Sequence, residues 1–314
     1  MPMPRKTKII VAGIGGVGGY FGGLLAKRYS NDIDVQVIFF ARHENLKEIR
    51  LNGLQVINGK GTITAIPFLA TDNPEEIGKA DLILICTKSY DLEAVIHQLK
   101  PCVSEETIIL PLLNGVDGPE RIRKMLPTTN VLEGCVYIVS KLIRPGTVEN
   151  TGNVETLYFG QPGNNNHEML SIEKIIKDAG IDALLSEQIS EIVWEKFIFI
   201  SPTATATSYF NTNIAKTIEA NKETLLQLIK EVKNIAIALG LSVNESIIPN
   251  TMAKLTSLPN GVTSSMHRDF MAGKTHTELE TLTGYVVRTA QQLGVPAPTY
   301  KKLYHQLKEK ILSP

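Results

Sequence analysis

Four closely spaced glycines follow directly after the first apolar run of the chain. They stand at Gly13, Gly15, Gly16 and Gly18, with Val17 between the last two, and an amphipathic segment covers residues 17–28. The first glycine permits a tight turn, the second lets the backbone approach a pyrophosphate, and the last lets a helix pack closely on a strand. The helix N-terminus adds unpaired N–H groups. The five residues therefore predict a dinucleotide site; the alternative interpretation is a glycine-rich turn without a ligand.

The first half of the chain alternates short β-branched runs with helical patterns. Strands are predicted at residues 8–12, 35–40, 63–67, 82–86, 107–110, 131–139, 154–159 and 181–185, and helices at 17–28, 92–99 and 119–125. The continuous apolar run 82–86 is typical of a parallel strand covered on both faces by helices. From about residue 186, long helical periods take over, at 189–200, 219–239 and 277–293. We predict an α/β fold, with an N-terminal Rossmann-type domain over residues 1–186 and an all-α substrate and catalytic domain over 187–314.

Composition excludes several classes of protein. Lysine plus arginine total 32 and aspartate plus glutamate total 32, so no charge excess favours nucleic acid. The three cysteines lack CxxC spacing and fit a reducing compartment. No stretch approaches the roughly 20 apolar residues of a membrane helix, and no HxH or HExxH spacing indicates a metal site. We expect a cytoplasmic protein that binds neither membrane nor nucleic acid, and whose helical region is compatible with a homodimer.

The end of the second predicted strand bears on the choice of dinucleotide. An NAD site usually has an acidic residue there for the ribose hydroxyls, whereas this chain has Arg42. A guanidinium group suits a 2′-phosphate through planar, charge-assisted hydrogen bonds. Glu44 follows closely, so the position is not purely basic. The prediction is NADPH; the alternative is an ordinary surface arginine.

Polar residues also follow two later core strands. Lys88 comes just after the strand at 82–86, and Asn114 follows the strand at 107–110. Open α/β sheets bind their ligands beyond the carboxyl ends of their strands, so both side chains are candidate ligand contacts. The alternatives are a loop lysine and an ordinary Asn-Gly turn.

A lysine interrupts an apolar helical face at the start of the helical region. At about 100° per residue, one arc is formed by Ile189, Ile192, Val193, Phe197 and Ile200, and Lys196 falls near its middle. We expect Lys196 to point into a cleft, where partial desolvation lowers the pKa of its ammonium group and makes it a usable proton donor. The alternative is a lysine that snorkels to solvent.

Taken together, these residues resemble the ketopantoate reductase (2-dehydropantoate 2-reductase) family. The resemblance spans residues 8 to about 290 and rests on Gly13, Gly15, Gly18, Arg42, Thr87-Lys88, Asn114-Gly115, Trp194-Glu195-Lys196, Ser264-Ser265-Met266, Asp269 and Glu278. It implies an NADPH-dependent reduction of 2-dehydropantoate to pantoate, which supplies pantothenate and coenzyme A.

The resemblance also implies roles for single residues. Lys196 would protonate the nascent alkoxide while hydride reaches the ketone carbon, and Lys88 and Asn114 would lie near both nicotinamide and substrate. Ser265 would bind the substrate carboxylate and Glu278 its hydroxyl groups. Lys196 and Glu278 are thus the candidate catalytic residues.

Helix starts offer an alternative explanation for part of this set. Thr275 and Thr277 each precede a glutamate by three positions, the spacing of a capping box, so Glu278 has a competing role as a helix cap. Ser264 and Ser265 are likewise suited to begin a helix without binding a ligand.

Two departures from the family concern the substrate. Ile200 stands where family members that reduce ketopantoate usually carry an asparagine, and Ser201 or Thr203 is a candidate replacement. The spacing from Asp269 to Glu278 is one residue longer than in the family. A site built around a hydrogen bond discriminates strongly between substrates. The alternatives are therefore a paralogous reductase of another 2-oxo acid and a non-catalytic NADP(H)-binding sensor.

Overall fold

The structure, a computed structural model, describes residues 6–164 and 166–312. Its contacts divide the chain into two compact units. The first unit comprises the residues up to Leu113 together with Gly118–Ile189, and the second comprises Asn114–Asp117 together with the residues from Ser190 onward. The short loop Asn114–Asp117 therefore belongs structurally with the C-terminal helices, although it lies within the N-terminal half of the chain.

A parallel sheet forms the centre of the first unit. Among the described residues it has six strands, in the order β5 (Leu69–Thr71), β2 (Val35–Phe40), β1 (Thr7–Ala12), β6 (Leu82–Ile85), β7 (Ile108–Pro111) and β8 (Asn130–Val131). The helices of this unit are α1 (Gly16–Arg28), α2 (His43–Asn52), α3 (Leu92–Leu99), α4 (Gly118–Met125) and α5 (His167–Asp178). All the pairings in this sheet are parallel.

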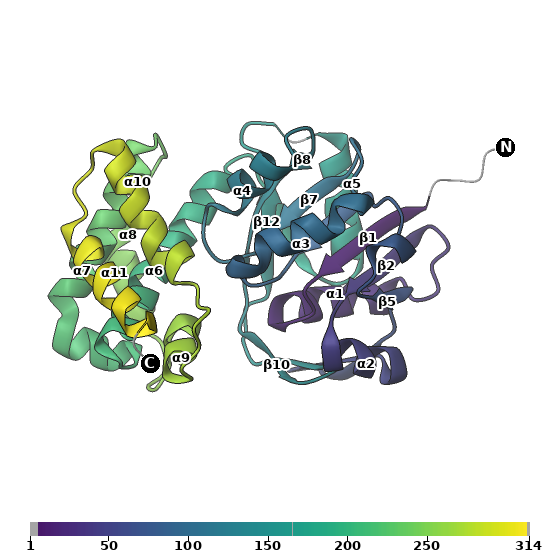
Figure 1. The fold of residues 1–314 in the computed structure, drawn as a ribbon, viewed down its shortest axis with the longest axis horizontal. Helices are drawn as coiled ribbons and strands as arrows, with labels where there is room; N and C mark the ends of the chain where they lie inside the picture. Colours follow the sequence, from purple (N-terminus) through teal and green to yellow (C-terminus); the bar gives the residue numbers. More distant parts are fainter. Residues whose placement is uncertain (1–5, 165, 313–314) are drawn as a thin grey trace. The chain divides into compact units, whose positions relative to one another are not determined.

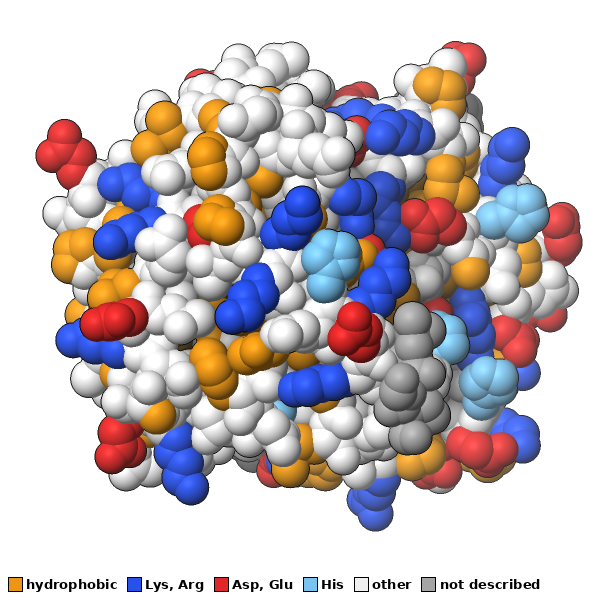
Figure 2. Space-filling model, turned by 60° about the vertical axis from the view of Figure 1, so that its left-hand side comes forward, with side chains coloured by type: hydrophobic (Ala, Val, Ile, Leu, Met, Phe, Trp, Pro, Cys, Tyr) orange, Lys and Arg blue, Asp and Glu red, His pale blue; other side chains and the backbone are white. Residues whose placement is uncertain are grey.

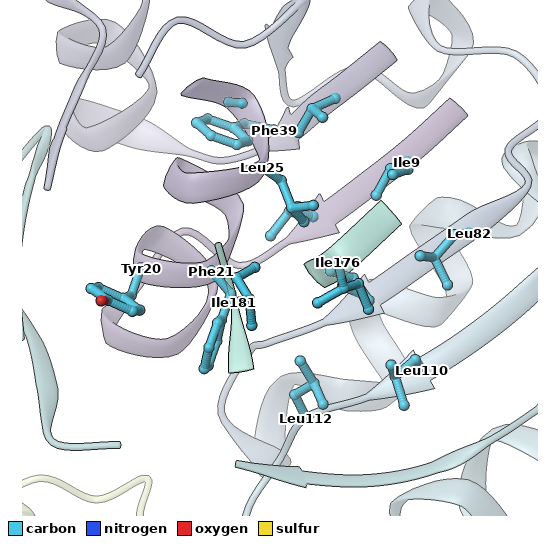
Figure 3. Close-up of a cluster of buried hydrophobic side chains, with 14 of the residues drawn as sticks. Ile9, Tyr20, Phe21, Leu25, Phe39, Leu82, Leu110, Leu112, Ile176 and Ile181 are labelled. Atoms are coloured by element: carbon cyan, nitrogen blue, oxygen red, sulfur yellow. The ribbon is translucent and has the colours of Figure 1, made fainter. Parts of the chain in front are cut away.

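Alternate residues of each strand pack into two different cores. Ile9 of β1 and Phe39 of β2 share one core with side chains of α1 and α5, and Figure 3 shows Phe21 and Leu25 of α1 in this cluster. Ile10, the neighbour of Ile9, joins the other core with side chains of α3 and α4. Helices therefore cover both faces of the sheet (Figure 1). This explains why the strand at 82–86 is apolar throughout.

Two smaller sheets complete the first unit. One has the order β10 (Ser140–Arg144), β11 (Thr147–Asn150), β3 (Leu54–Asn58) and β4 (Gly61–Ala65), and the other has β13 (Asp182–Leu185), β12 (Thr156–Gly160) and β9 (Glu133–Tyr137). The predicted strand 131–139 is two strands, because β8 joins the central sheet and β9 the small one. The sequence analysis missed β3, β5, β10, β11, α2 and α5.

The second unit is helical in its described residues. It contains α6 (Ile189–Phe210), α7 (Ile214–Ala238), α8 (Ile247–Thr256), α9 (Ser265–Met271), a π-helical turn (Glu280–Gly284, the π turn), α10 (Tyr285–Leu293) and α11 (Pro298–Leu312). The central helix α7 packs against α8, α10 and α11 (Figure 1). A parallel α/β sheet followed by an all-α region confirms the predicted fold class.

The ends of two helices are closed by glycines, whereas a third helix is longer than its predicted range. Gly240 and Gly294 follow α7 and α10 with φ values of +83° and +66°, the left-handed conformation typical of a helix C-terminus. By contrast, α6 does not end at Ile200 but continues through Pro202 to Phe210. Residues 201–208 are all buried, so packing outweighs the roughly 3 kcal/mol by which proline disfavours a helix interior.

Charged side chains of both signs are scattered over the face shown in Figure 2, among polar and apolar groups. This distribution agrees with the equal totals of acidic and basic residues. Within the described part of the chain, no helix is both long and apolar enough to cross a membrane.

Candidate active site

The glycine turn joins β1 to α1. Gly13 has a φ of +92°, a conformation that other residues rarely adopt, and a Cβ there would lie 2.6 Å from the methyl carbon of Thr87. A Cβ on Gly18 would overlap the carbonyl oxygen of Gly13. Gly16 packs against the backbone of Ser140 in the same way. These glycines are therefore required by the close approach of strand, helix and neighbouring loops.

Gly15 has different surroundings, because a Cβ there would meet no atom within 4 Å. It is the N-cap residue of α1, no side chain caps this helix end, and the first turn holds no acidic residue. Val17 packs partly buried against the adjacent core. The backbone at Gly15 thus borders open space at the positive end of a helix, which fits the pyrophosphate of a dinucleotide.

Asn45 of α2, which the sequence analysis missed, holds this turn in place. Its amide nitrogen donates to the carbonyl of Ile14 at 2.8 Å, and its side-chain oxygen accepts from the N–H of Gly146 at 2.8 Å. One side chain therefore ties the glycine turn to the loop between β10 and β11. No local pattern marks this role, because Gly146 lies 101 positions away.

Arg42 lies two residues beyond β2, as the N-cap residue of α2, and is partly buried. Its guanidinium group donates to the side-chain oxygen of Gln98 at 2.8 Å. The nearby Glu44 forms an ion pair with Lys47 at 2.7 Å, so its negative charge is partly neutralised. The local charge beyond β2 is therefore more favourable to a phosphate than the sequence alone indicates.

Lys88 lies just beyond β6 in the first unit, and it is partly buried at the start of a short 3-10 turn, Ser89–Asp91. The other predicted substrate contacts, Asn114, Lys196, Ser265 and Glu278, all belong to the second unit.

Lys196 of α6 contacts Asn114. Its ammonium group donates to the side-chain oxygen of Asn114 at 3.3 Å, and both residues are partly buried. The aromatic rings of Trp194, Phe197 and Tyr285 pack on one another beside it, with centroids 5.4 to 6.2 Å apart. An ammonium group is thus held beside an amide, next to three aromatic rings that pack on one another. Two residues predicted from separate motifs are brought together.

Ser265 and Glu278 form a second pair. Glu278 is only 2% exposed, and its carboxylate accepts from the Ser265 hydroxyl at 3.4 Å. The adjacent Ser264 is the N-cap of α9, where its hydroxyl oxygen accepts from the N–H of His267 at 3.0 Å. The two serines therefore divide the roles: Ser264 starts the helix and Ser265 is directed to the buried glutamate.

Neighbouring side chains bear on the helix-cap alternative for Glu278. The hydroxyl of Thr277 accepts from the N–H of Leu279 at 3.3 Å. The hydroxyl of Thr275 lies 3.1 Å from a ring nitrogen of His276. Asp269, the remaining motif residue, forms an ion pair with Lys274 at 2.7 Å, which is a local contact after α9.

His267, in the first turn of α9, is a buried imidazole with partners on both ring nitrogens. Nδ1 lies 2.6 Å from the hydroxyl of Thr263, and Nε2 lies 3.0 Å from the side-chain oxygen of Asn211. Burial, with a smaller contribution from the charge of Arg268, lowers the pKa of His267 below its ordinary value. The neutral form of His267, in the helix that carries Ser265, is therefore favoured in the folded protein.

The free energy of unfolding is expected to fall as the pH drops below about 6.5, the ordinary pKa of histidine in an unfolded chain. Below that pH the unfolded chain binds a proton that folded His267 still excludes, so acid favours unfolding. Urea denaturation at about pH 7.5 and about pH 5.5, on either side of the unfolded pKa, measures the effect. His267→Gln should reduce the difference; an unchanged pH dependence in this variant would contradict the assignment.

Comparison with known proteins places these residues in a family. The family model Ketopantoate reductase PanE/ApbA matches residues 9–164, and Ketopantoate reductase PanE/ApbA C terminal matches residues 188–311. The chain belongs to the ketopantoate reductase family. The predicted resemblance is therefore confirmed, and the protein is an oxidoreductase of this family.

Individual relatives align with nearly the whole chain. A crystal structure of 2-dehydropantoate 2-reductase from Porphyromonas gingivalis W83 is 36% identical, with a TM-score of 0.85 over 96% of this chain and 99% of that one. An uncharacterized oxidoreductase, YkpB of Bacillus subtilis (strain 168), is 29% identical over 96% of this chain and 97% of its own. The 2-dehydropantoate 2-reductase of Halobacterium salinarum is 27% identical over 94% of this chain and 96% of its own.

The departure from the ketopantoate reductase pattern at Ile200 directs attention to the two hydroxyl groups that follow it, Ser201 and Thr203. Ser201 is fully buried, and its hydroxyl lies 2.6 Å from both the carbonyl oxygen of Leu282 and the hydroxyl of Tyr300. The hydroxyl of Thr203 donates to the carbonyl of Phe199, one turn earlier, at 2.6 Å. Both hydroxyls are therefore bonded inside the helical unit, which does not favour Ser201 or Thr203 as the replacement for the family's asparagine.

Proposed function

We propose that this protein reduces 2-dehydropantoate to pantoate with NADPH, a step toward pantothenate and coenzyme A. The observation that carries the proposal is the contact between Lys196 and Asn114, which holds an ammonium group beside an amide in the unit that also contains the Ser265–Glu278 pair. Together these residues offer a proton donor, neutral hydrogen-bonding groups and a carboxylate, which suit a hydroxylated 2-oxo acid.

In the proposed reaction, the chain's residues bind the substrate and deliver one proton. The hydroxyl of Ser265 binds the substrate carboxylate, and Glu278 accepts from a substrate hydroxyl. Lys196 donates a proton to the ketone oxygen as that oxygen becomes an alkoxide, and Asn114 orients the ammonium group. A dinucleotide held at the glycine turn would supply a hydride to the ketone carbon. Two electrons and one proton from the dinucleotide, together with one further proton, thus convert the 2-oxo acid to the 2-hydroxy acid.

Support for NADPH comes from the surroundings of Arg42 and from the glycine turn. The open backbone at Gly15 fits the pyrophosphate, whose charge the N-terminus of α1 favours. Arg42, held by Gln98, offers a guanidinium group to the 2′-phosphate of NADPH, while the charge of Glu44 is partly offset by Lys47.

Arg42→Ala is expected to raise the KM for NADPH by about 10- to 100-fold, the value of one to two charge-assisted hydrogen bonds. The KM for NADH should change little, because NADH lacks the 2′-phosphate. Steady-state kinetics with both cofactors measure the change, and Lys60→Ala, which removes an exposed positive charge elsewhere in the same unit, is the control. Equal use of NADH and NADPH by the unaltered protein would overturn the role of Arg42.

A second candidate function is the reduction of another 2-oxo acid. It is favoured by Ile200, since the hydroxyls of Ser201 and Thr203 already have hydrogen-bond partners within the helical unit. NADPH oxidation measured with 2-dehydropantoate and with a panel of aliphatic and aromatic 2-oxo acids separates the functions. Efficient turnover of 2-dehydropantoate supports the first, and turnover of another acid alone supports the second. NADPH binding without any turnover would indicate a non-catalytic sensor instead.

A further inference from the structure

The π turn lies directly after Glu278 and interrupts the helix that this residue begins. The N–H of Leu282 still bonds the carbonyl of Glu278 at 2.9 Å, in the α-helical manner, whereas the N–H of Tyr285 reaches back five residues to the carbonyl of Glu280. A π-helical turn holds more residues than an α-helical turn, so it rotates the residues before it relative to those after it. The direction of Glu278 relative to α10 therefore depends on this turn.

On one side, the π turn is bonded to α6, the helix of Lys196. The hydroxyl of Ser201 donates to the carbonyl of Leu282 at 2.6 Å. One turn further along α6, the hydroxyl of Thr205 lies 2.8 Å from that of Thr283. All four groups are buried, and hydrogen bonds in such surroundings fix their partners firmly.

On another side, the π turn packs against the loop of Asn114. The next residue, Gly115, has a φ of +102°, and a Cβ there would overlap the methyl carbon of Thr281. Thr281 is buried, so its side chain fills the space that the glycine leaves. The π turn therefore contacts the loop of Asn114 as well as the helix of Lys196, and it follows Glu278 in the chain.

Arg288 of α10 holds the π turn from its outer side. One guanidinium nitrogen donates to the side-chain carboxylate of Glu280 at 2.7 Å, and the other donates to the backbone carbonyl of the same residue at 3.0 Å. The same carbonyl accepts the π-helical hydrogen bond from the N–H of Tyr285, five residues later. The hydroxyl of Tyr304 donates to the same carboxylate at 2.7 Å. A cation with a single donating centre cannot make both contacts of Arg288 in this geometry.

We propose that the π turn is the positioning element of the candidate active site, and that Arg288 is a positioning residue that keeps it in place. Arg288 acts through the π turn on three groups at once: Glu278 before it, Lys196 through Ser201 and Thr205, and Asn114 through Gly115. The inference rests on the proposed function for its effect on rate, although the mechanical role of Arg288 is independent of the substrate.

The test compares Arg288→Ala and Arg288→Lys with Lys308→Ala. Lys308 is the matched control, because its ammonium group lies 3.9 Å from the same carboxylate of Glu280 in this structure and makes no contact with the π-turn backbone in the described hydrogen bonds. Two readouts are used: kcat on the best 2-oxo acid, and the fluorescence of Trp194, the chain's single tryptophan, whose ring centroid lies 6.2 Å from that of Tyr285.

Arg288→Ala is expected to lower kcat by about 10- to 100-fold, since small displacements of reacting groups have effects of this size. It should leave the KM for NADPH unchanged and shift the emission of Trp194. Arg288→Lys, which keeps the charge but loses the second contact, should recover less than half of the lost rate. Lys308→Ala should match the unaltered protein in both readouts.

Three results would overturn the proposal: full activity of Arg288→Ala, complete rescue by Arg288→Lys, or a loss of rate without any change in Trp194 emission. If Arg288→Ala failed to fold, Arg288→Lys alone would decide by the same two readouts. If the unaltered protein reduced no 2-oxo acid, the proposed function would fail, whereas the Trp194 comparison would still decide whether Arg288 holds the π turn.

Discussion

Lys196→Ala is expected to lower kcat by about 10²- to 10⁴-fold, the usual contribution of general acid catalysis. The ammonium group is held 3.3 Å from Asn114, so the variant loses the donor while the amide stays in place. The KM for the substrate should change less than kcat, because the proton moves as negative charge develops on the ketone oxygen. Single-turnover oxidation of NADPH measures the chemical step directly.

The matched control for this variant is Lys254→Ala. Lys254 is an exposed lysine of the same unit, and it pairs at 3.0 Å with Glu195, the residue before Lys196. Its loss removes the same charge from the neighbouring surface, and the rate should stay near that of the unaltered protein. If Lys196→Ala kept more than about a tenth of the original rate, the residue would not be the proton donor.

The glycine turn and the core strands could be predicted because their signals are local. The glycine pattern is contained in a few consecutive residues, although only Gly18 meets an atom close by in the chain, the carbonyl oxygen of Gly13, whereas Gly13 itself is constrained by the distant Thr87. The strand at 82–86 is marked by its own continuous apolar run, and Lys196 by a single cation that interrupts an apolar helical arc. In each case the residues that carry the signal are consecutive or lie on one helix, even where their partners are far away in the chain.

The second sheet could not be predicted in the same way. Strand β11 pairs in parallel with β3, roughly ninety positions earlier, and their sequences TVEN and LQVIN contain no long apolar run. Strand β10, with the sequence SKLIR, is mostly exposed. Short, half-polar strands acquire their conformation from their partners, so the sequence analysis identified only the neighbourhood of β4.

The residues of the candidate site also divide into those with a local sequence signal and those whose role depends on distant partners. Glu278 and Ser265 were found as single residues, but the separate role of Ser264 depends on its bond to the N–H of His267, and the burial of Ser201 depends on Tyr300, 99 positions away. The π turn has no marker in its own residues. Its contacts with Thr205 and Gly115 exist only after the helical unit has packed.

Gly18→Ala is expected to abolish detectable NADPH binding and to lower the free energy of unfolding by about 1–3 kcal/mol, as overpacking of a tight contact does. Its new Cβ would overlap the carbonyl oxygen of Gly13 and would lie 2.8 Å from the Cβ of Cys86. Because backbone atoms cannot rotate away as a flexible side chain can, α1 must move off the sheet. Thermal unfolding and the fluorescence of bound NADPH report the two effects.

Gly15→Ala separates cofactor binding from stability. A Cβ at this position meets no atom within 4 Å, and the φ of −95° is open to alanine, so stability should change by about 1 kcal/mol or less. The methyl group would nevertheless occupy the space that the pyrophosphate needs, and NADPH affinity should fall at least about tenfold. Tight NADPH binding by Gly15→Ala would show that the dinucleotide lies elsewhere. Loss of both stability and binding in Gly15→Ala would instead contradict the separation of the two effects, since no protein atom lies within 4 Å of the new methyl group.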